Sequence, residues 1–169
     1  MPSFSMDLCI LRHAHAEKTS PDFERRLTEG GFGHIRALGE FLKGKACLHI
    51  DSIWCSPLVR AEQTAKVFIE HAGLYVTPER SILLEPDRNV RELMAKILEK
   101  NRNTLLVGHN PQLEELLSFL LMHSSDSGTF VMSEGVFICL RQESSPKYRP
   151  PFGRWSLRYF LNSSLFEKI

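Results

Sequence analysis

The sequence predicts an α/β protein with a largely parallel sheet that is covered by helices on both faces. Short apolar runs of strand length alternate with segments whose apolar residues recur at helical spacing, and this alternation continues over most of the chain. A chain of 169 residues is long enough for a proper core but leaves little for a second one. We therefore expect residues 1–169 to form a single domain.

The composition is close to that of ordinary soluble proteins, with 43% hydrophobic and 24% charged residues. The formal net charge is +1, so no global field attracts nucleic acid or an anionic membrane, and we expect neither as a partner. The N-terminus lacks the basic start of a signal peptide, and no apolar run approaches the roughly 20 residues that cross a bilayer. These features predict a cytoplasmic protein.

The first apolar run, residues 8–11, ends in Arg12, His13 and Ala14. Strand interiors rarely hold such a polar pair, whereas the carboxyl ends of parallel strands are where α/β proteins bind ligands. Arginine provides a cationic fork that suits phosphate, and histidine provides a nitrogen that can attack or carry a proton. The pair indicates an anion site at this edge of the sheet, unless it is only an exposed pair that follows a buried strand.

The next segments continue the alternation of loop, helix and strand. Residues 16–26 are polar and have the composition of a loop, and Thr28 is expected to cap a helix that stops near Gly44. A second strand is predicted over residues 48–55. Pro57 is expected in the first turn of the second helix, because its missing N–H costs nothing there.

Gly73 is expected to end the second helix, and the rest of the chain changes character only near its end. The predicted elements are strand-like fragments at 75–76 and 81–84, a helix over 90–100, a strand over 103–108, a leucine-rich helix over 113–121, and strands over 136–140 and 155–161. Residues 144–151, which separate the last two strands, are rich in turn formers. No repeat or long linker interrupts the chain.

Three polar signals fall at or just after the carboxyl ends of predicted parallel strands: Arg12-His13, residues 56–60, and His109-Asn110. Right-handed crossovers place these ends on one edge of the sheet. Two histidines and two arginines that meet there suit phosphoryl transfer through a covalent phosphohistidine, with the arginines neutralising the phosphoryl oxygens. The attacking ring must stay neutral, which normally requires a partner on its other nitrogen, and the sequence does not identify that partner.

Four motifs occur in order along the chain: Arg12-His13-Ala14, Leu27-Thr28-x-x-Gly31, Ser56-Pro57-x-x-Arg60-Ala61-x-Gln63-Thr64-Ala65 and Gly108-His109-Asn110-Pro111. Together they resemble the histidine phosphatase superfamily, and within it the small SixA-type phosphohistidine phosphatases. The resemblance spans residues 8–121. It implies a three-layer α/β/α sandwich of the phosphoglycerate mutase-like fold and a hydrolase that needs no metal or organic cofactor. It makes His13 the phosphorylated nucleophile, with Arg12, Arg60 and His109 as the phosphate pocket.

Two positions depart from the family pattern, and the general acid is open. Ala14 replaces the usual glycine, as it does in SixA-like relatives, and Thr19 stands where mutase-like members have asparagine, which disfavours a mutase. Larger members use a carboxylate as the acid, and Glu85 is the nearest match, with Asp87 the second choice. A phosphohistidine substrate needs less help, because its phosphorus–nitrogen bond breaks readily once the ring is protonated. Glu85 could equally be a surface carboxylate.

These features predict a phosphatase that hydrolyses a phosphohistidine (a phosphoramidate) or a phosphate monoester through phospho-His13. Little sequence is left for a lid between residues 77 and 90, and an open site admits a protein side chain, so a phosphorylated protein is the leading substrate. A small phosphorylated substrate, such as a sugar or nucleotide phosphate, is the alternative. A catalytically silent phosphohistidine-binding module is another, although such a module has no need to keep the nucleophile.

The cysteines have no metal-type spacing, and we expect Cys9, Cys47, Cys55 and Cys139 to be reduced thiols. Cys55 invites comparison with the cysteine phosphatases, but the arginine comes one residue too early and the loop has no glycine, so a cradle of N–H groups would be hard to form. The sequence therefore favours histidine over cysteine as the nucleophile.

Overall fold

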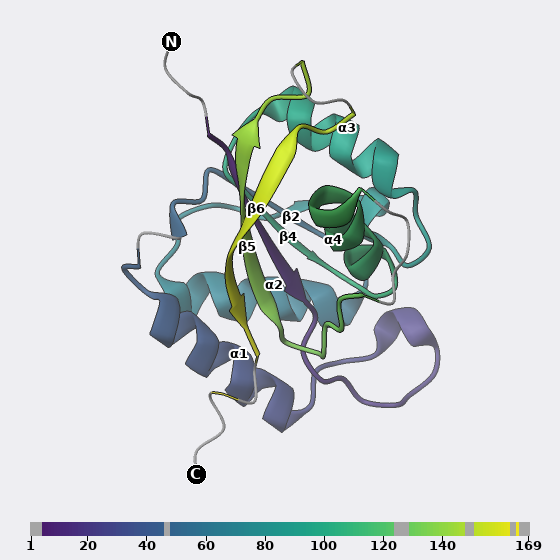
Figure 1. The fold of residues 1–169 in the computed structure, drawn as a ribbon. Helices are drawn as coiled ribbons and strands as arrows, with labels where there is room; N and C mark the ends of the chain where they lie inside the picture. The colour runs from purple at the N-terminus through teal and green to yellow at the C-terminus, as the bar shows by residue number, and fades with distance from the viewer. Residues whose placement is uncertain (1–4, 46–47, 124–128, 148–150, 163–164, 166–169) are drawn as a thin grey trace.

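A six-stranded sheet forms the middle layer of the computed structural model, which describes residues 5–45, 48–123, 129–147, 151–162 and 165 (Figure 1). In chain order the elements are β1 (Asp7–Arg12), the 3₁₀ turn η1 (Asp22–Glu24), α1 (Glu29–Leu42), β2 (Ser52–Cys55), α2 (Val59–Ala72), β3 (Glu79–Arg80), the 3₁₀ turn η3 (Ile82–Leu84), α3 (Val90–Lys100), β4 (Thr104–Gly108), α4 (Gln112–Met122), β5 (Phe137–Ser144) and β6 (Arg154–Leu161).

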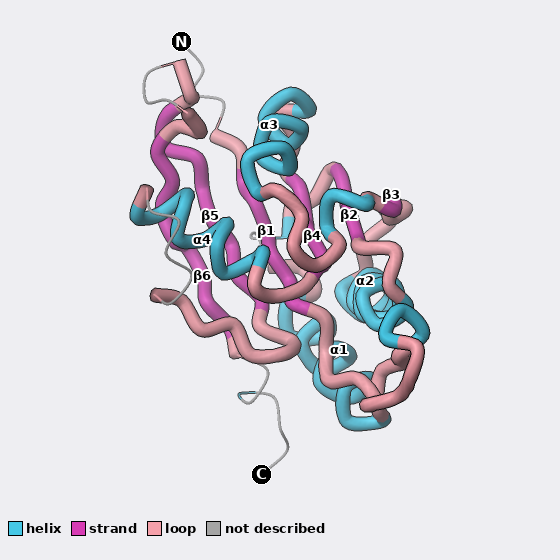
Figure 2. Tube along the Cα trace, turned by 90° about the vertical axis from the view of Figure 1, so that its right-hand side faces the viewer, coloured by secondary structure: helices cyan, strands magenta, loops and turns pink. Residues whose placement is uncertain are grey.

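The strands lie in the order β3-β2-β4-β1-β5-β6, which can be followed across Figure 2 from β3 on the right to β6 on the left. The first four strands of this order pair in parallel, and β5 and β6 pair antiparallel. The predicted mostly parallel sheet is confirmed. The carboxyl ends of β1, β2 and β4 therefore share one edge, with Arg12 opposite Gly108 and Cys55 opposite Val107.

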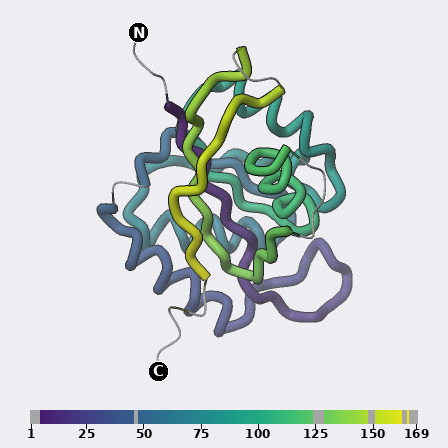
Figure 3. Tube along the Cα trace, in the orientation of Figure 1, coloured from purple at the N-terminus to yellow at the C-terminus, as the bar shows by residue number. Residues whose placement is uncertain are grey.

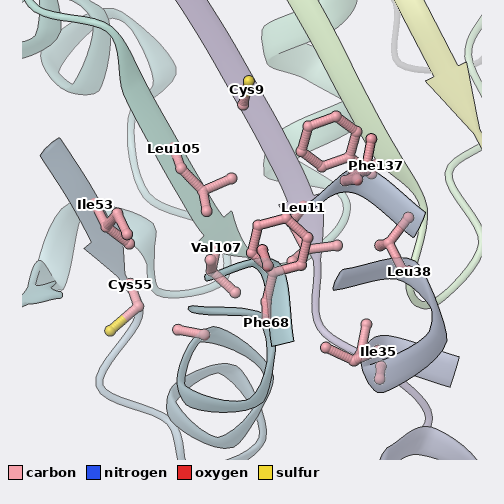
Figure 4. Packing of buried hydrophobic residues seen from close by; sticks show 14 of the residues in the cluster. Cys9, Leu11, Ile35, Leu38, Ile53, Cys55, Phe68, Leu105, Val107 and Phe137 are labelled. Carbon is pink, nitrogen blue, oxygen red and sulfur yellow. The ribbon is translucent and has the colours of Figure 1, made fainter. Parts of the chain in front are cut away.

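Helices cover both faces of this sheet and give it three layers. Alternate residues of β1 point to opposite faces, as the pleat of a strand requires. Cys9 and Leu11 pack with α1 and α2 in one core, whereas Leu8 and Ile10 pack with α3 and α4 in the other. In the first core, Phe68 of α2 stacks on Phe137 with ring centroids 5.8 Å apart (Figure 4). The expected α/β/α sandwich is confirmed.

Thr28 begins α1 as the sequence predicts. Its Oγ1 accepts the N–H of Gly31 at 3.0 Å, and its own N–H donates to the carbonyl of His15. A Cβ on Gly31 would clash with that same carbonyl, so the close approach of α1 to the segment after β1 requires glycine here. The spacing Leu-Thr-x-x-Gly thus joins a helix cap to the loop that follows the first strand.

Two predicted strands differ from the observed ones. The strand predicted over 48–55 begins only at Ser52, because the N–H groups of Asp51 and Ser52 both donate to the carbonyl of Asn103, and pairing with β4 starts there. Leu48 and Ile50 are still buried, but they belong to the preceding loop. Neither fragment at 75–76 nor at 81–84 is a strand; β3 lies between them, and η3 follows it.

Pro57 was expected in the first turn of the second helix, but this prediction is wrong, because α2 begins two residues later, at Val59. Leu58 is the N-cap of α2 with an extended backbone (φ −71°, ψ 136°), so Pro57 precedes the cap. Gly73 ends α2 in the left-handed conformation with φ 67°, as predicted.

The antiparallel tail contributes one turn to the site edge. The N–H of Gly135 donates to the carbonyls of Arg12 and His13, which brings the turn at 133–135 to the carboxyl end of β1. The described residues of segment 144–151 lie at the opposite end, because β5 runs antiparallel to β1 (Figure 3). Cys9, Cys55 and Cys139 are buried thiols that form no disulfide with one another, and Cys47 lies outside the described residues. In the described part of the chain, no helix is long and apolar enough to cross a membrane.

Candidate active site

His13 is held at the carboxyl end of β1 with one ring nitrogen already used. The backbone N–H of His13 donates to the carbonyl of Gly108 at 3.0 Å, and the ring nitrogen Nδ1 lies 2.8 Å from the carbonyl oxygen of Ala14. A carbonyl can only accept, so Nδ1 carries a hydrogen. When the ring is neutral, its lone pair is therefore on Nε2. The partner that the sequence could not identify is a backbone carbonyl.

The surroundings keep the His13 ring neutral. Burial lowers the pKa of His13 from 6.5 to about 4; the bond to Ala14 opposes this shift, and the positive charges of Arg60, Arg12 and Arg25 reinforce it. A ring with such a pKa is unprotonated at neutral pH and has a nucleophilic nitrogen available.

His109 lies beside His13, with ring centroids 5.0 Å apart. Burial, with the charges of His13 and Arg60 next in size, lowers the pKa of His109 from 6.5 to about 3. Its Nε2 lies 2.8 Å from Oγ of Ser56, and that oxygen also accepts the N–H of Leu58. The Ser56 hydroxyl is free to donate to Nε2, and the neutral ring then carries its hydrogen on Nδ1.

Arg12 and Arg60 each use terminal nitrogens of the guanidinium for hydrogen bonds within the protein. Arg12 donates from NH1 to the carbonyl of Met132 at 2.6 Å. Arg60 donates from NH1 to the carbonyl of Asp22 at 2.8 Å and from NH2 to its carboxylate at 3.1 Å. Three buried nitrogens of this site, Nε of each arginine and Nδ1 of His109, have no hydrogen-bond partner among the described residues. Buried donors of this kind normally have a partner, and their gathering indicates an anion site.

Helix α2 is docked on the segment after β1 by two side chains of the third motif. Oγ1 of Thr64 accepts the N–H of Ala14 at 3.1 Å and donates to the carbonyl of Arg60 at 2.7 Å. Oε1 of Gln63 accepts the N–H of Leu27 at 2.8 Å. These bonds explain why Gln and Thr follow Arg60 at three and four residues. They fix the helix turn that carries Arg60 against the strand end that carries His13.

The segment that contains Met132 is braced by α4. Asn110 donates from Nδ2 to the carbonyl of Met132 at 2.9 Å and to Glu114 at 2.7 Å, and Glu114 accepts the N–H of Met132 at 2.9 Å. The carbonyl that receives Arg12 is thus held from the motif that also carries His109.

Glu85 lies in a segment close to the site, but its carboxylate has another partner. The carbonyl of Leu84 is next to Gly108, and Gln112 donates to the carbonyls of Leu83 and Arg88, so the chain around Glu85 packs against the end of β4. The carboxylate accepts Nε and NH2 of Arg88 at 3.0 and 2.6 Å. Asp87, the second candidate acid, is exposed in the adjoining turn with φ 65°.

Cys55 does not fit the role of a nucleophile. Burial, followed by the negative charge of Glu62, raises the pKa of its thiol from 9.0 to about 11. The side chain belongs to the core between the sheet and the α1/α2 layer (Figure 4). A neutral, buried thiol is a poor nucleophile.

The structure therefore brings together Arg12, His13, Arg60 and His109 and adds two residues to them. Ser56 begins the third sequence motif, but nothing in the sequence links it to His109. Asp22 is visible in the sequence only as a turn former, and its contact with Arg60 spans 38 residues of chain. In the described residues, no group of three or more His, Cys, Asp or Glu side chains is arranged to hold a metal ion.

Residues 8–85 match the family model of the histidine phosphatase superfamily (branch 1). The matched stretch is slightly less than half of the chain, and over it the sequence is similar to that superfamily. The matched segment contains Arg12, His13, Arg60 and Glu85, and His109 follows it. No curated protein is similar enough in sequence to be counted as a relative.

Several solved structures have a similar fold. One is the protein histidine phosphatase SixA complexed with tungstate, with a TM-score of 0.82, 22% identity, and coverage of 96% of this chain and 100% of that one. Another is the α-ribazole phosphatase from Shigella flexneri, with a TM-score of 0.72, 18% identity, and coverage of 94% of this chain and 97% of that one. A third is a mycobacterial glucosyl-3-phosphoglycerate phosphatase, with a TM-score of 0.69, 18% identity, and coverage of 90% of this chain and 97% of that one. The chain has the phosphoglycerate mutase-like fold of the superfamily.

Proposed function

We propose that this chain is a member of the histidine phosphatase superfamily and a phosphatase that transfers a phosphoryl group to Nε2 of His13 and then to water. The observation that carries the proposal is the fixed state of His13, a buried, neutral ring whose Nδ1 is bound to the Ala14 carbonyl. Beside it, two arginines each have a buried Nε–H that finds no partner within the part of the chain that the structure describes. A nucleophile with its lone pair on a known atom, next to donors for the equatorial oxygens, is what in-line transfer requires.

The first step forms a bond between Nε2 and phosphorus while the bond from phosphorus to the leaving group breaks. Arg12, Arg60 and Nδ1–H of His109 hold the oxygens on which charge is spread. In the second step water attacks phospho-His13, the phosphorus–nitrogen bond breaks, and its electron pair returns to Nε2. Inorganic phosphate is released, and His13 is neutral again.

A phosphohistidine on a partner protein is the substrate that we favour. The segment between α2 and α3 packs along the sheet, since the N–H of Ser81 donates to the carbonyl of Cys55 and Leu84 lies next to Gly108. A segment held in this way is not expected to act as a lid over the site, which favours a protein side chain as the substrate. Glu85 is paired with Arg88, and a phosphohistidine needs little from a general acid. The similar structures carry names of both protein and small-molecule phosphatases, so small phosphate esters are the competing class.

The test is to incubate the protein with N-phosphoimidazole and with p-nitrophenyl phosphate and to look for acid-labile phosphate on the enzyme. We expect phosphorylation at Nε2 of His13, located by NMR, and a fall of at least about a thousandfold in turnover of both substrates in His13→Ala. His49→Ala, an exposed histidine near the opposite edge of the sheet, serves as the matched control. Turnover that persists in His13→Ala would overturn the mechanism, and faster turnover of sugar phosphates than of phosphohistidine peptides would move the substrate to the small-molecule class.

A further inference from the structure

Asp22 places a carboxylate against Arg60, one of the two arginines of the proposed phosphate pocket. Its Oδ2 accepts NH2 of Arg60 at 3.1 Å, and its Oδ1 accepts NH1 of Arg25, also at 3.1 Å. Arg25 is itself anchored, because its Nε donates to the carbonyl of Glu17 at 2.6 Å. The carboxylate is thus held from two sides on the loop that follows His13, which projects from the purple part of the chain in Figure 3.

This carboxylate is charged and open to a ligand. The hydrogen bond from Arg25, with the charge and hydrogen bond of Arg60, lowers the pKa of Asp22, so it is ionised at neutral pH. The Asp22 side chain is 63% exposed, whereas that of Arg60 is 5% exposed. Its negative charge also reaches the site itself, where it partly opposes the lowering of the pKa of His109 by burial and by the charges of His13 and Arg60.

A fixed anion in this position is unfavourable for phosphate alone. It partly cancels the attraction of Arg60 for phosphoryl oxygens, and it repels a leaving group that departs with a negative charge. It attracts a leaving group that carries a positive charge. An anion-binding site gains from such a carboxylate only when its substrate brings a cation next to the phosphoryl group.

We propose that Asp22 is a specificity residue that favours substrates in which the phosphoryl group is bonded to a protonated nitrogen ring; this rests on the proposed function. In the ring form of phosphohistidine that is protonated on the other nitrogen, the N–H donates to the Asp22 carboxylate. As Nε2 of His13 bonds to phosphorus, the electron pair of the phosphorus–nitrogen bond returns to the ring. The ring then leaves as neutral imidazole, and no general acid is needed.

The competing explanation is that Asp22 only orients Arg60. In that case its loss weakens every interaction of Arg60 alike, including binding of a phosphate analogue. If Asp22 acts by charge, its neutralisation removes an unfavourable interaction with the oxyanion and a favourable one with the leaving group. The two explanations therefore predict opposite changes in the affinity for a simple oxyanion.

The experiment compares Asp22→Asn with the wild type on N-phosphoimidazole and p-nitrophenyl phosphate, with tungstate as the inhibitor. We expect the ratio of kcat/KM for the phosphoramidate over the aryl ester to fall about tenfold, and tungstate to bind a fewfold more tightly. Asp22→Glu, which keeps the charge, should restore most of the ratio. Glu24→Gln removes a carboxylate from the same 3₁₀ turn and should leave both rates unchanged.

Equal losses on both substrates with weaker tungstate binding would overturn the proposal and leave Asp22 as a positioning residue for Arg60. Glu134 is a second carboxylate whose charge acts on Arg60. A ratio that changes in Glu134→Gln but not in Asp22→Asn would also overturn it. A failure of the proposed function gives a different result, namely that His13→Ala turns over both substrates as fast as the wild type.

Discussion

The two ends of β1 each have an arginine–aspartate pair nearby, and the pairs are built in opposite ways. Near the amino end, Arg141 donates from Nε and NH2 to the two oxygens of Asp7, both at 2.8 Å. Near the carboxyl end, Arg60 shares its donors between the backbone and the carboxylate of Asp22, and its Nε has no partner among the described residues. The first pair satisfies itself, whereas the second keeps a donor for a third group.

Burial is reversed between the pairs as well. Near the amino end the carboxylate is the buried member, with side-chain exposures of 11% for Asp7 and 38% for Arg141. At the site the arginine is buried, with 5% for Arg60 and 63% for Asp22. The bonds to Asp7 raise the pKa of Arg141, whereas burial lowers that of Arg60. A buried cation with a spare donor suits an incoming anion, and a saturated pair suits the link between two strands.

The largest expected difference between these ends is in catalysis. We expect Arg60→Ala to lower kcat/KM for N-phosphoimidazole by about 10²–10³-fold, because it removes donors to the phosphoryl oxygens. Arg141→Ala should leave kcat/KM within about twofold and cost on the order of 1 kcal/mol of stability, since the arginine is partly exposed. Steady-state kinetics and urea unfolding of the two variants give both quantities. Comparable losses of activity in both would remove the distinction.

The pH dependence of His13 tests the electrostatic part of the comparison. In an NMR titration we expect its ring signals to move with a midpoint of about 4, because burial and the nearby arginines disfavour the charged ring. The ring is then neutral and competent above this pH and loses its lone pair below it. In Arg60→Ala the midpoint should rise, since one of the charges that lower the pKa is gone. An unchanged midpoint in that variant would mean that Arg60 does not act on His13.

The smallest effect is expected at Glu85. Because its carboxylate is bound by Arg88, Glu85→Gln should change turnover by less than about twofold on both a phosphate ester with a good leaving group and one with a poor leaving group. Asp87→Asn removes the second candidate acid in the same turn and should also leave both rates within about twofold. A loss confined to the poor leaving group would assign Glu85 as the general acid.

Sequence pattern predicts which residues lie close together where topology alone decides it. Arg12, His13, Arg60 and His109 meet because parallel strands with right-handed crossovers end at one edge, and this follows from the order of strands and helices. The helix over 90–100 and the cap at Thr28 are also confirmed, since each depends on local signals within a few residues.

The remaining features depend on contacts that residue types do not encode. The partner of His13 is the carbonyl of Ala14, and every residue type has such a carbonyl. Asp22 meets Arg60 only after the loop behind β1 folds onto α2. The late start of β2 is set by the carbonyl of Asn103, which takes the N–H groups of both Asp51 and Ser52. The bond within His13-Ala14 is local, whereas the contacts of Asp22 and Asn103 are products of tertiary structure.

Thr64 also connects the site to the opening motions of the protein. Its hydroxyl joins the N–H of Ala14 to the carbonyl of Arg60, so any fluctuation that lifts the start of α2 from the sheet separates the nucleophile from its arginine in the same event. A molecule in which the start of α2 has separated from the sheet is then also inactive. An oxyanion that bridges His13 and Arg60 would draw the population away from this species by mass action, and turnover itself would protect the helix from unfolding.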